Sequence, residues 1–211
     1  MYEVPSQFDR YDSYDSSSNA IGTMAFIMNG TTQANTKRIF YVYYDTVENG
    51  AKNSANYGSS FSYTWNGEEL NVNNTNLAFW IDTVRGENTS GLYRVRGIAT
   101  ENEIWYNIPG ANEKTIEYMQ YSNGTYNFSF DFRNNATVKY NGPARMVIEQ
   151  RGNETLWNST NVTEGFVAKR YVFYKDLYWI KIETNFTNMG GSEITRNSSF
   201  AVAIAFDMQR E

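Results

Sequence analysis

The amino-acid sequence predicts an all-β protein, an antiparallel β-sandwich of about a dozen short strands with no significant helix. Short apolar or alternating runs recur at the spacing of β-strands, and no segment keeps the 3.6-residue apolar period of a helix. The breaks between the runs carry turn chemistry, including Asn-Gly pairs that begin at Asn29, Asn49, Asn66 and Asn123. Many short strands joined by regular turns indicate a sandwich rather than alternating βαβ units.

Thirteen segments fit a strand by their apolar or alternating pattern. They are residues 20–28, 38–44, 60–65, 77–82, 92–98, 103–108, 114–121, 125–132, 136–140, 144–150, 166–174, 177–187 and 194–206. Asn123-Gly124 lies between two aromatic alternating runs, so we expect a tight hairpin there. The run Phe200–Phe206 is apolar on both faces, which predicts a central strand that is covered on both sides.

The chain is expected to form a flexible N-terminal arm over residues 1–18 and a single β-sandwich domain over residues 19–211. The arm is rich in Ser, Asp and Tyr, which favours a solvated segment. The competing interpretation is an arm that becomes ordered against a neighbour through Phe8, Tyr11 and Tyr14.

Composition narrows the chemistry that the chain can perform. Cys and His are both absent, which excludes a disulfide scaffold, a thiolate nucleophile and a Cys-ligated metal site, and which removes the commonest general base. The net charge is −5 and no Lys/Arg run is present, so a nucleic-acid partner is not expected. We therefore expect neither an enzyme nor a bound cofactor.

Asn-x-Ser/Thr sequons are the strongest signal in the sequence. The chain has 26 Asn, and 35 of its 211 residues are Ser or Thr, so chance gives about 4 sequons. Eleven are present, at Asn29, Asn73, Asn88, Asn123, Asn127, Asn135, Asn153, Asn158, Asn161, Asn185 and Asn197. The excess predicts covalent N-glycans and an extracellular, cell-surface location.

The position of two sequons supports the same interpretation. Strand period places Asn127 opposite the face of Phe128 and Phe130. It likewise places Asn185, with Lys181 and Glu183, opposite a buried face formed by Tyr178, Ile180 and Ile182. Both Asn side chains are therefore expected to point outward, where a glycan has room.

Export conflicts with the start of the chain. Met1–Pro5 has neither the basic nor the apolar region of a signal peptide, and no apolar stretch approaches the ~20 residues that a membrane helix needs. We expect that a leader or membrane anchor is missing from this chain.

Three other chemistries were weighed against plainer interpretations. Asp45–Gly50 places oxygen ligands around a turn and could hold Ca²⁺, but it lacks a full ligand series, so a polar turn is favoured. A glycosidase-like acid/base pair from Glu68, Glu69 and Asp131 needs a separation that spacing does not show. Tryptophans could stack on sugar rings, although core or interface packing is favoured; they are Trp65, Trp80, Trp105, Trp157 and Trp179.

Many sequons without cysteine resemble the composition of archaeal cell-surface proteins. Phe40–Lys52 looks like an opening strand and turn of secreted archaeal β-sandwich proteins. Lys169–Glu183 resembles the paired strands of large sandwiches that also occur in carbohydrate-active proteins. The resemblance implies a sandwich glycoprotein of the extracellular-filament, surface-layer or pilin-head type, and it carries over no catalytic residue.

The leading functional hypothesis is a structural surface glycoprotein, a self-assembling subunit of an archaeal extracellular filament (a pilus or thread) or of a surface layer. Its partners are expected to be copies of itself, held by strand exchange or by sheet-edge contacts. The two-sided apolar run 20–28 is the expected donor strand, and the competing interpretation is that it is the first strand of its own sandwich. The first alternative function is a carbohydrate-binding or adhesion module, and the second is a carbohydrate-active enzyme.

Overall fold

A computed structural model describes residues 3–28, 30–43, 47–49, 57–67, 69–82, 91–98, 103–105, 117–122, 127–131, 136–156, 162–190, 201–204 and 207–208. This part of the chain is all-β, as predicted, and its strands form three antiparallel sheets. The helical structure that it contains is one 3-10 turn, η1 (Val47–Asn49). Within these residues no helix has the length and apolarity needed to cross a membrane.

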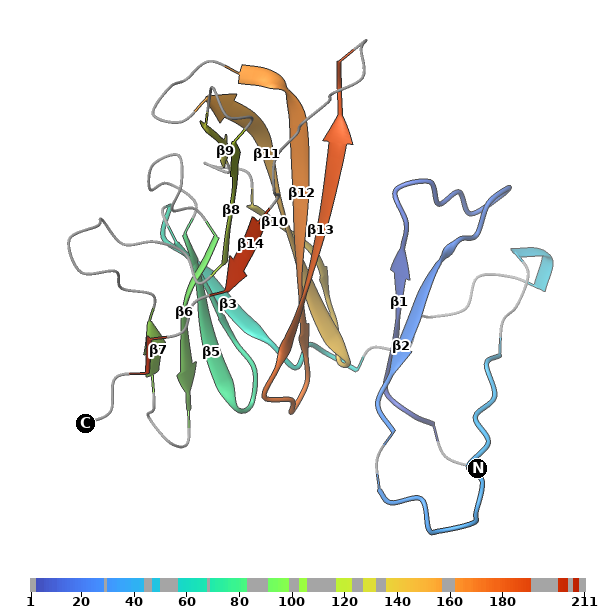
Figure 1. Ribbon diagram of the computed structural model, residues 1–211. Coiled ribbons are helices and arrows are strands. Elements are labelled where there is room, and N and C mark those ends of the chain that lie inside the picture. Colours follow the sequence, from blue (N-terminus) through green and yellow to red (C-terminus); the bar gives the residue numbers. More distant parts are fainter. Residues whose placement is uncertain are drawn as a thin grey trace.

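Two large sheets make up the body of the protein (Figure 1). One has seven strands in the order β13-β12-β11-β9-β8-β14, with β10 also paired to β11, and the other has six in the order β15-β7-β6-β5-β4-β3. The first consists of β8 (Glu117–Ser122), β9 (Asn127–Asp131), β10 (Ala136–Asn141), β11 (Arg145–Leu156), β12 (Val162–Tyr174), β13 (Ile180–Asn188) and β14 (Ala201–Ile204). The second consists of β3 (Ser62–Trp65), β4 (Glu69–Asn73), β5 (Leu77–Asp82), β6 (Gly91–Gly97), β7 (Glu103–Trp105) and β15 (Asp207–Met208).

The two large sheets face each other across a shared apolar core. Successive side chains of a strand point to opposite faces, so Met146 and Ile148 of β11 enter the core while Val147 and Glu149 face away from it. The rings of Phe79 in β5 and Phe173 in β12 meet across the core with their centroids 4.6 Å apart. Full burial of such a side chain contributes about 1.5–3 kcal/mol, so this layer holds the sheets together.

The amide of Asn74 ties the sheets together at one end of the sandwich. Its Nδ2 donates to the carbonyl oxygens of Tyr174 (3.0 Å) and Leu177 (3.2 Å), in the turn between β12 and β13. Its Oδ1 accepts the N–H of Asn76 (2.8 Å) and of Leu77 (2.7 Å), which shapes its own turn. A buried amide that uses both ends in this way fixes the two turns relative to each other.

Most of the expected strands are present. The pairing of Ser122 with Asn127 confirms that β8 and β9 form a hairpin, but a tight two-residue turn at Asn123-Gly124 would pair Ser122 with Thr125, so the predicted turn is wrong in its length. The strands expected over residues 166–174 and 177–187 are present as β12 and β13, which pair with each other. The expectation that Phe200–Phe206 is a central strand is wrong for its described part, because β14 pairs with β8 alone and ends the sheet.

Three differences concern strands that the sequence analysis missed or misplaced. Strand β4 was not expected, because Leu70 and Val72 alternate with the polar residues Glu69, Asn71 and Asn73 in a short segment that is polar on average. A strand was expected over residues 38–44, but Arg38–Tyr43 lies outside every sheet. Within residues 1–18, which the sequence analysis assigned to an arm, Ser6–Arg10 forms a further strand, β1.

Strand β1 pairs with β2 (Gly22–Phe26) to form a separate two-stranded sheet, the N-terminal hairpin, which stands beside the sandwich (Figure 1). At its tip the Asp15 carboxylate accepts bonds from the hydroxyl and N–H of Ser17 and from the N–H of Ser18. The side-chain bond from Ser17 is the main cause that lowers the pKa of Asp15 below its ordinary value of 3.8. The tip is therefore stabilised while Asp15 is ionised, and this contribution is lost as the pH falls through the lowered pKa.

Candidate functional site

The two faces of the N-terminal hairpin have opposite character. The register pairs Phe8 with Met24 and Ser6 with Phe26, so these side chains share one face. Gln7 and Asp9 point to the other face, toward the sandwich. The hairpin thus turns a polar face inward and an apolar face outward, the reverse of an ordinary surface hairpin.

The polar face docks on the turn between β10 and β11. Gln7 Oε1 accepts the N–H of Ala144 (3.0 Å) and of Arg145 (2.9 Å). The Asp9 carboxylate, almost fully buried, binds Arg145 through Nε and Nη2, both at 2.6 Å. Gly142 allows the close approach, since a Cβ at that position would lie 2.4 Å from Gln7 Oε1. Four charge-assisted or backbone bonds therefore fix β1 on the sandwich.

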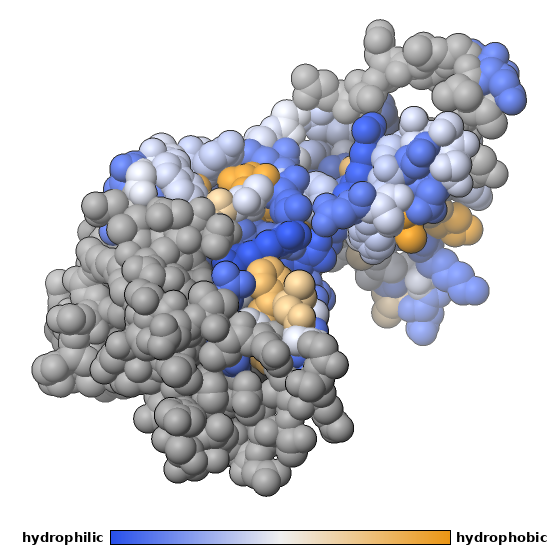
Figure 2. Space-filling view, turned by 90° about the horizontal axis from the view of Figure 1, so that it is seen from above, coloured by the Kyte–Doolittle hydropathy of each residue, from blue (hydrophilic) through white to orange (hydrophobic). Residues whose placement is uncertain are grey.

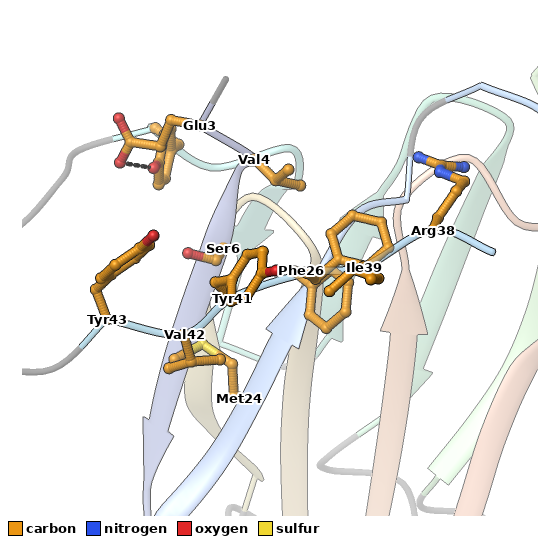
Figure 3. Close-up of a pocket in the computed structure, with 12 residues that line it drawn as sticks. Glu3, Val4, Ser6, Met24, Phe26, Arg38, Ile39, Tyr41, Val42 and Tyr43 are labelled. Carbon is orange, nitrogen blue, oxygen red and sulfur yellow. Dashed lines mark hydrogen bonds between the residues drawn. The ribbon is translucent and has the colours of Figure 1, made fainter. Parts of the chain in front are cut away.

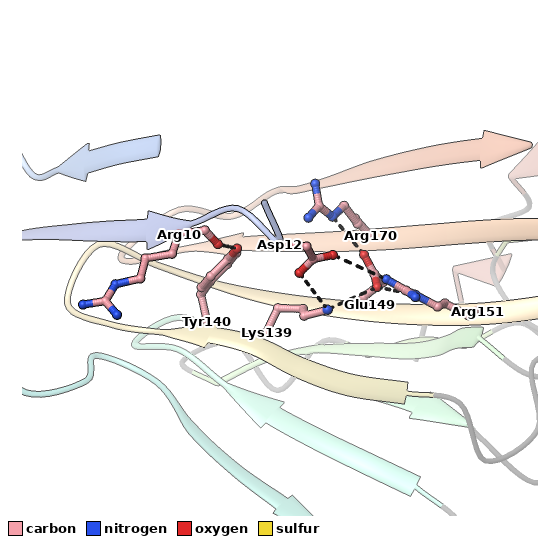
Figure 4. A network of polar contacts seen from close by, with 7 residues as sticks. All are labelled: Arg10, Asp12, Lys139, Tyr140, Glu149, Arg151 and Arg170. Carbon is pink, nitrogen blue, oxygen red and sulfur yellow. Dashed lines mark hydrogen bonds and ion pairs between the residues drawn. The ribbon is translucent and has the colours of Figure 1, made fainter. Parts of the chain in front are cut away.

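Beyond this contact a charged network covers the outward face of β10, β11 and β12 (Figure 4). The buried Glu149 carboxylate contacts Arg151 (2.6 Å), Arg170 (3.2 Å) and Lys139 (3.7 Å). Asp12 approaches Lys139 (3.4 Å) and Arg151 (3.8 Å) from the hairpin side. Because the hairpin joins these ion pairs through the exposed Asp12, the network adds little to the attachment that Gln7 and Asp9 provide.

A tyrosine hydroxyl of the sandwich also binds the hairpin. Tyr140 of β10 donates a hydrogen bond to the carbonyl oxygen of Arg10 in β1. Burial, followed by the neighbouring Asp9 carboxylate, raises the pKa of Tyr140, so the phenol keeps the proton that it donates.

We expect Asp9→Asn to loosen the hairpin without unfolding the sandwich. The change leaves Arg145 without its buried counter-ion, at a cost of about 2–3 kcal/mol, somewhat below the range for fully buried pairs because Arg145 keeps contact with water. Amide hydrogen exchange over β1 and β2 should speed up by at least about tenfold, while exchange in β5 and β12 should not change.

Asp12→Asn is the matched control for this variant. Its carboxylate is 74% exposed, so its ion pairs contribute less than about 0.5 kcal/mol. Equal exchange rates in the two variants would show that the Asp9–Arg145 pair does not hold the hairpin.

The outward face of the hairpin is partly covered by the segment Arg38–Tyr43, which crosses it (Figure 3). Phe40 packs the segment against the hairpin, because the centroid of its ring lies 5.1 Å from that of Phe26. The Arg38 guanidinium lies over the same ring, 5.3 Å from its centroid. A cleft of about 750 Å³ remains between segment and hairpin, lined by Val4, Met24 and Phe26 on one side and by Ile39, Tyr41 and Val42 on the other. The Arg38 guanidinium also donates a hydrogen bond to the carbonyl oxygen of Gly30 (3.1 Å), so the segment is attached to the hairpin region by more than the Phe40 ring.

Exposed apolar residues of the hairpin and of this segment form a surface that is here named the apolar strip. Figure 2 shows hydrophobic surface on the part of the molecule that projects beside the sandwich. Ile39 is 70% exposed and Tyr41 66%. The strip consists of Phe8, Met24, Phe26, Met28, Ile39, Tyr41, Val42 and Tyr43.

The area of the strip sets it apart from ordinary surface. Its eight residues are between 41% and 76% exposed, which amounts to about 900 Å² if each offers roughly 200 Å² in full. The largest apolar patch of a typical monomer measures about 300–600 Å², while one partner contributes about 800 Å² to a standard protein interface. The strip has the size of one side of a subunit interface.

The sequence analysis did not identify this surface. The strand expected over residues 20–28 is present as β2, but Gly22–Phe26 pairs with β1 in a separate sheet, so the interpretation as the first strand of the sandwich is wrong and donation to a second copy stays a prediction. The missed signal is the alternation of polar Gln7 and Asp9 with Phe8, a period-2 pattern inside a segment dominated by Ser and Asp.

Four of the eleven sequons lie in described strands. Asn153 of β11 and Asn185 of β13 are exposed, and Asn73 at the end of β4 is half-buried. Asn127 starts β9, and its side chain lies outside the described residues. The other seven also lie outside the described residues: Asn29, Asn88, Asn123, Asn135, Asn158, Asn161 and Asn197.

The outward position predicted for Asn185 is confirmed, since Ile180 and Ile182 pack against the core on the opposite face. Tyr178, expected beside them, is instead exposed because it precedes the strand in the β12–β13 turn. Asn153 shares the outward face with Asn185, across β12. The register separates their Cα atoms by about 12 Å, two strand spacings and two residues.

The residues weighed for other chemistry are dispersed. Glu69 lies in the six-stranded sheet and Asp131 in the seven-stranded one, while Asp45 and Glu68 lie outside the described residues. Within the described ranges no three His, Cys, Asp or Glu side chains gather as metal ligands would. Trp65 and Trp179 are about half exposed and Trp80 is half-buried; the side chains of Trp105 and Trp157 lie outside the described residues.

Comparison with known proteins adds no relative: no protein-family model, no curated protein and no solved structure matches the chain.

Proposed function

We propose that this chain is a structural cell-surface glycoprotein that assembles with copies of itself into an extracellular filament or surface layer. The observation that carries the proposal is the apolar strip, an interface-sized surface on a hairpin whose polar face is the one turned inward. A chain that leaves such a surface in water aggregates or finds a specific partner. The sequon excess supports an extracellular setting, because N-glycans are added to exported proteins.

Self-association as a function of concentration tests the proposal. Sedimentation velocity from low to high micromolar concentration should show a shift from monomer to large species, and electron microscopy of the concentrated sample should show ordered filaments or sheets. A chain that stays monomeric across this range, and likewise when isolated from its native surface, is not an assembly subunit.

A carbohydrate-binding or adhesion module is the second candidate, favoured by the β12–β13 turn. Tyr178 and Trp179 project there, and the Trp179 ring lies 4.8 Å from that of Tyr174. Exposed aromatic rings stack on the faces of sugars. Saturable binding of an oligosaccharide that Trp179→Ala abolishes, by a chain that does not self-associate, would favour this function over assembly.

A further inference from the structure

The outward face of β13 carries a glycosylation sequon in line with charged side chains. Ile180 and Ile182 pack against the core of the sandwich. The alternation of the strand therefore places Lys181, Glu183 and Asn185 together on the opposite, outward face. Asn185 is exposed and begins one of the sequons, so a glycan attached there starts on this face.

An aromatic pair lies at the other end of the same row. Phe173 enters the core, so Tyr174, the next residue of β12, points outward. The Trp179 ring lies against it, with the ring centroids 4.8 Å apart and the ring planes tilted by 49°. Trp179 is nevertheless 53% exposed. A large apolar ring that remains half exposed can stack on the apolar face of a sugar.

The turn between β12 and β13 fixes the position of this pair. The carbonyl oxygens of Tyr174 and Leu177 accept hydrogen bonds from Asn74 Nδ2 at 3.0 and 3.2 Å. The N–H of Lys175 donates to the carbonyl oxygen of Ala144 at 3.1 Å. The sandwich thus holds the turn in place before any ligand arrives, which lowers the entropy cost of binding.

The surface between Asn185 and the aromatic pair suits a sugar chain. Lys181 Nζ binds Glu183 Oε1 at 2.5 Å, and their side chains are 54% and 38% exposed, so they offer donors and acceptors to sugar hydroxyls. Ala168 lies directly opposite Asn185 in β12, and its small side chain leaves room for the first sugar. Asn185 and Trp179 are six residues apart, about 20 Å along an extended chain, a span that several sugar units cover.

We propose that the glycan on Asn185 lies along the outward face of β13 and stacks on the Trp179 ring of the same chain, an inference that rests on the proposed glycosylation. Tyr174 holds the ring in position, and Lys181 and Glu183 bind sugar hydroxyls between the two ends. The ligand of this aromatic site is then the chain's own carbohydrate. The glycan covers an apolar ring and keeps the outward face hydrophilic, so this face does not compete with the apolar strip for subunit contacts.

Hydroxyl-radical footprinting of glycosylated protein from the native host tests this contact. The unchanged chain and Asn185→Gln are compared at a concentration at which sedimentation velocity shows monomers. Loss of the glycan should speed the oxidation of Trp179 by at least about twofold, because a stacked sugar no longer covers its exposed surface. Tyr63, 46% exposed in the six-stranded sheet, is the internal reference and should not change. Asn153→Gln is the matched control, since it removes a glycan from the same outward face and should leave Trp179 unchanged.

The outcomes separate this inference from the proposed function. Equal oxidation of Trp179 in the unchanged chain and in Asn185→Gln, with Asn185 occupied in the unchanged chain, overturns the contact and leaves the proposed function standing. An equal acceleration in Asn153→Gln overturns the choice of glycan. Protection that disappears on dilution to monomers means that the sugar comes from a neighbouring copy, which overturns the contact within one chain. An unoccupied Asn185 also overturns the inference, whereas protein without a glycan at any sequon overturns the glycoprotein assignment as well.

Discussion

Replacing Tyr41 by aspartate should weaken self-association by at least about 100-fold while leaving the monomer folded. Burial of an aromatic side chain contributes about 1.5–3 kcal/mol, and a carboxylate placed in the same interface adds the cost of its desolvation. A loss of 1.4 kcal/mol corresponds to a factor of ten, so the two effects together exceed a factor of one hundred. The monomer should keep its β-type circular dichroism, because Tyr41 is 66% exposed and supports no buried contact in the core.

Tyr178→Asp is the matched control for this substitution. It introduces the same charge at a tyrosine that is 72% exposed, but on the β12–β13 turn, away from the apolar strip. Sedimentation velocity on both variants at equal concentration compares their self-association and shows which of the two surfaces forms the contact. If Tyr178→Asp abolishes assembly and Tyr41→Asp does not, the interface lies at the turn and the strip is not the contact.

The sequence predicts the body of this fold well because its core strands are amphipathic with period 2. Phe173, Ile180 and Ile182 stand on one face of their strands in the sequence and pack on the core in the structure. Their burial can be predicted from the neighbouring residues alone, because the alternation of apolar and polar side chains shows which face of the strand is buried. The alternating runs on either side of Asn123-Gly124 are also local, which is why the β8–β9 pairing is confirmed although the turn is longer than predicted.

The N-terminal region is harder to predict because its stability depends on contacts distant in sequence. Asp9 is buried by Arg145, and Gln7 is fixed by backbone groups of the β10–β11 turn. Nothing in the segment around Asp9 indicates that a carboxylate will be buried there, and an Asp- and Ser-rich stretch ordinarily indicates solvated chain.

The strand predicted over residues 38–44 is wrong for a different reason. There the local preference for a strand is strong, but Arg38–Tyr43 belongs to no sheet in the described part of the chain, and the Phe40 ring packs on Phe26 of the hairpin instead.

Glycan attachment should raise the mass of the protein from its native host above the 24.3 kDa of the polypeptide by several glycan units. Asn153 and Asn185 are expected to be among the occupied sites, because both are exposed on the outward face of the seven-stranded sheet. Asn73 should be occupied less, since it is half-buried beside the amide of Asn74 that ties two turns together. Mass spectrometry of glycopeptides from the native protein measures all three sites.

The variants Asn153→Gln and Asn185→Gln make the prediction specific. Each should lower the intact mass by one glycan and leave assembly unchanged, because both sites lie on the outward face of the sandwich and neither belongs to the apolar strip. A glycan at either site would keep this face in contact with water in the assembled particle, since a bulky polar chain does not fit into a packed subunit contact. If the native protein has the mass of the bare polypeptide, the sequon excess no longer supports export. Loss of assembly in Asn185→Gln would mean that the outward face of β13, rather than the strip, joins the subunits.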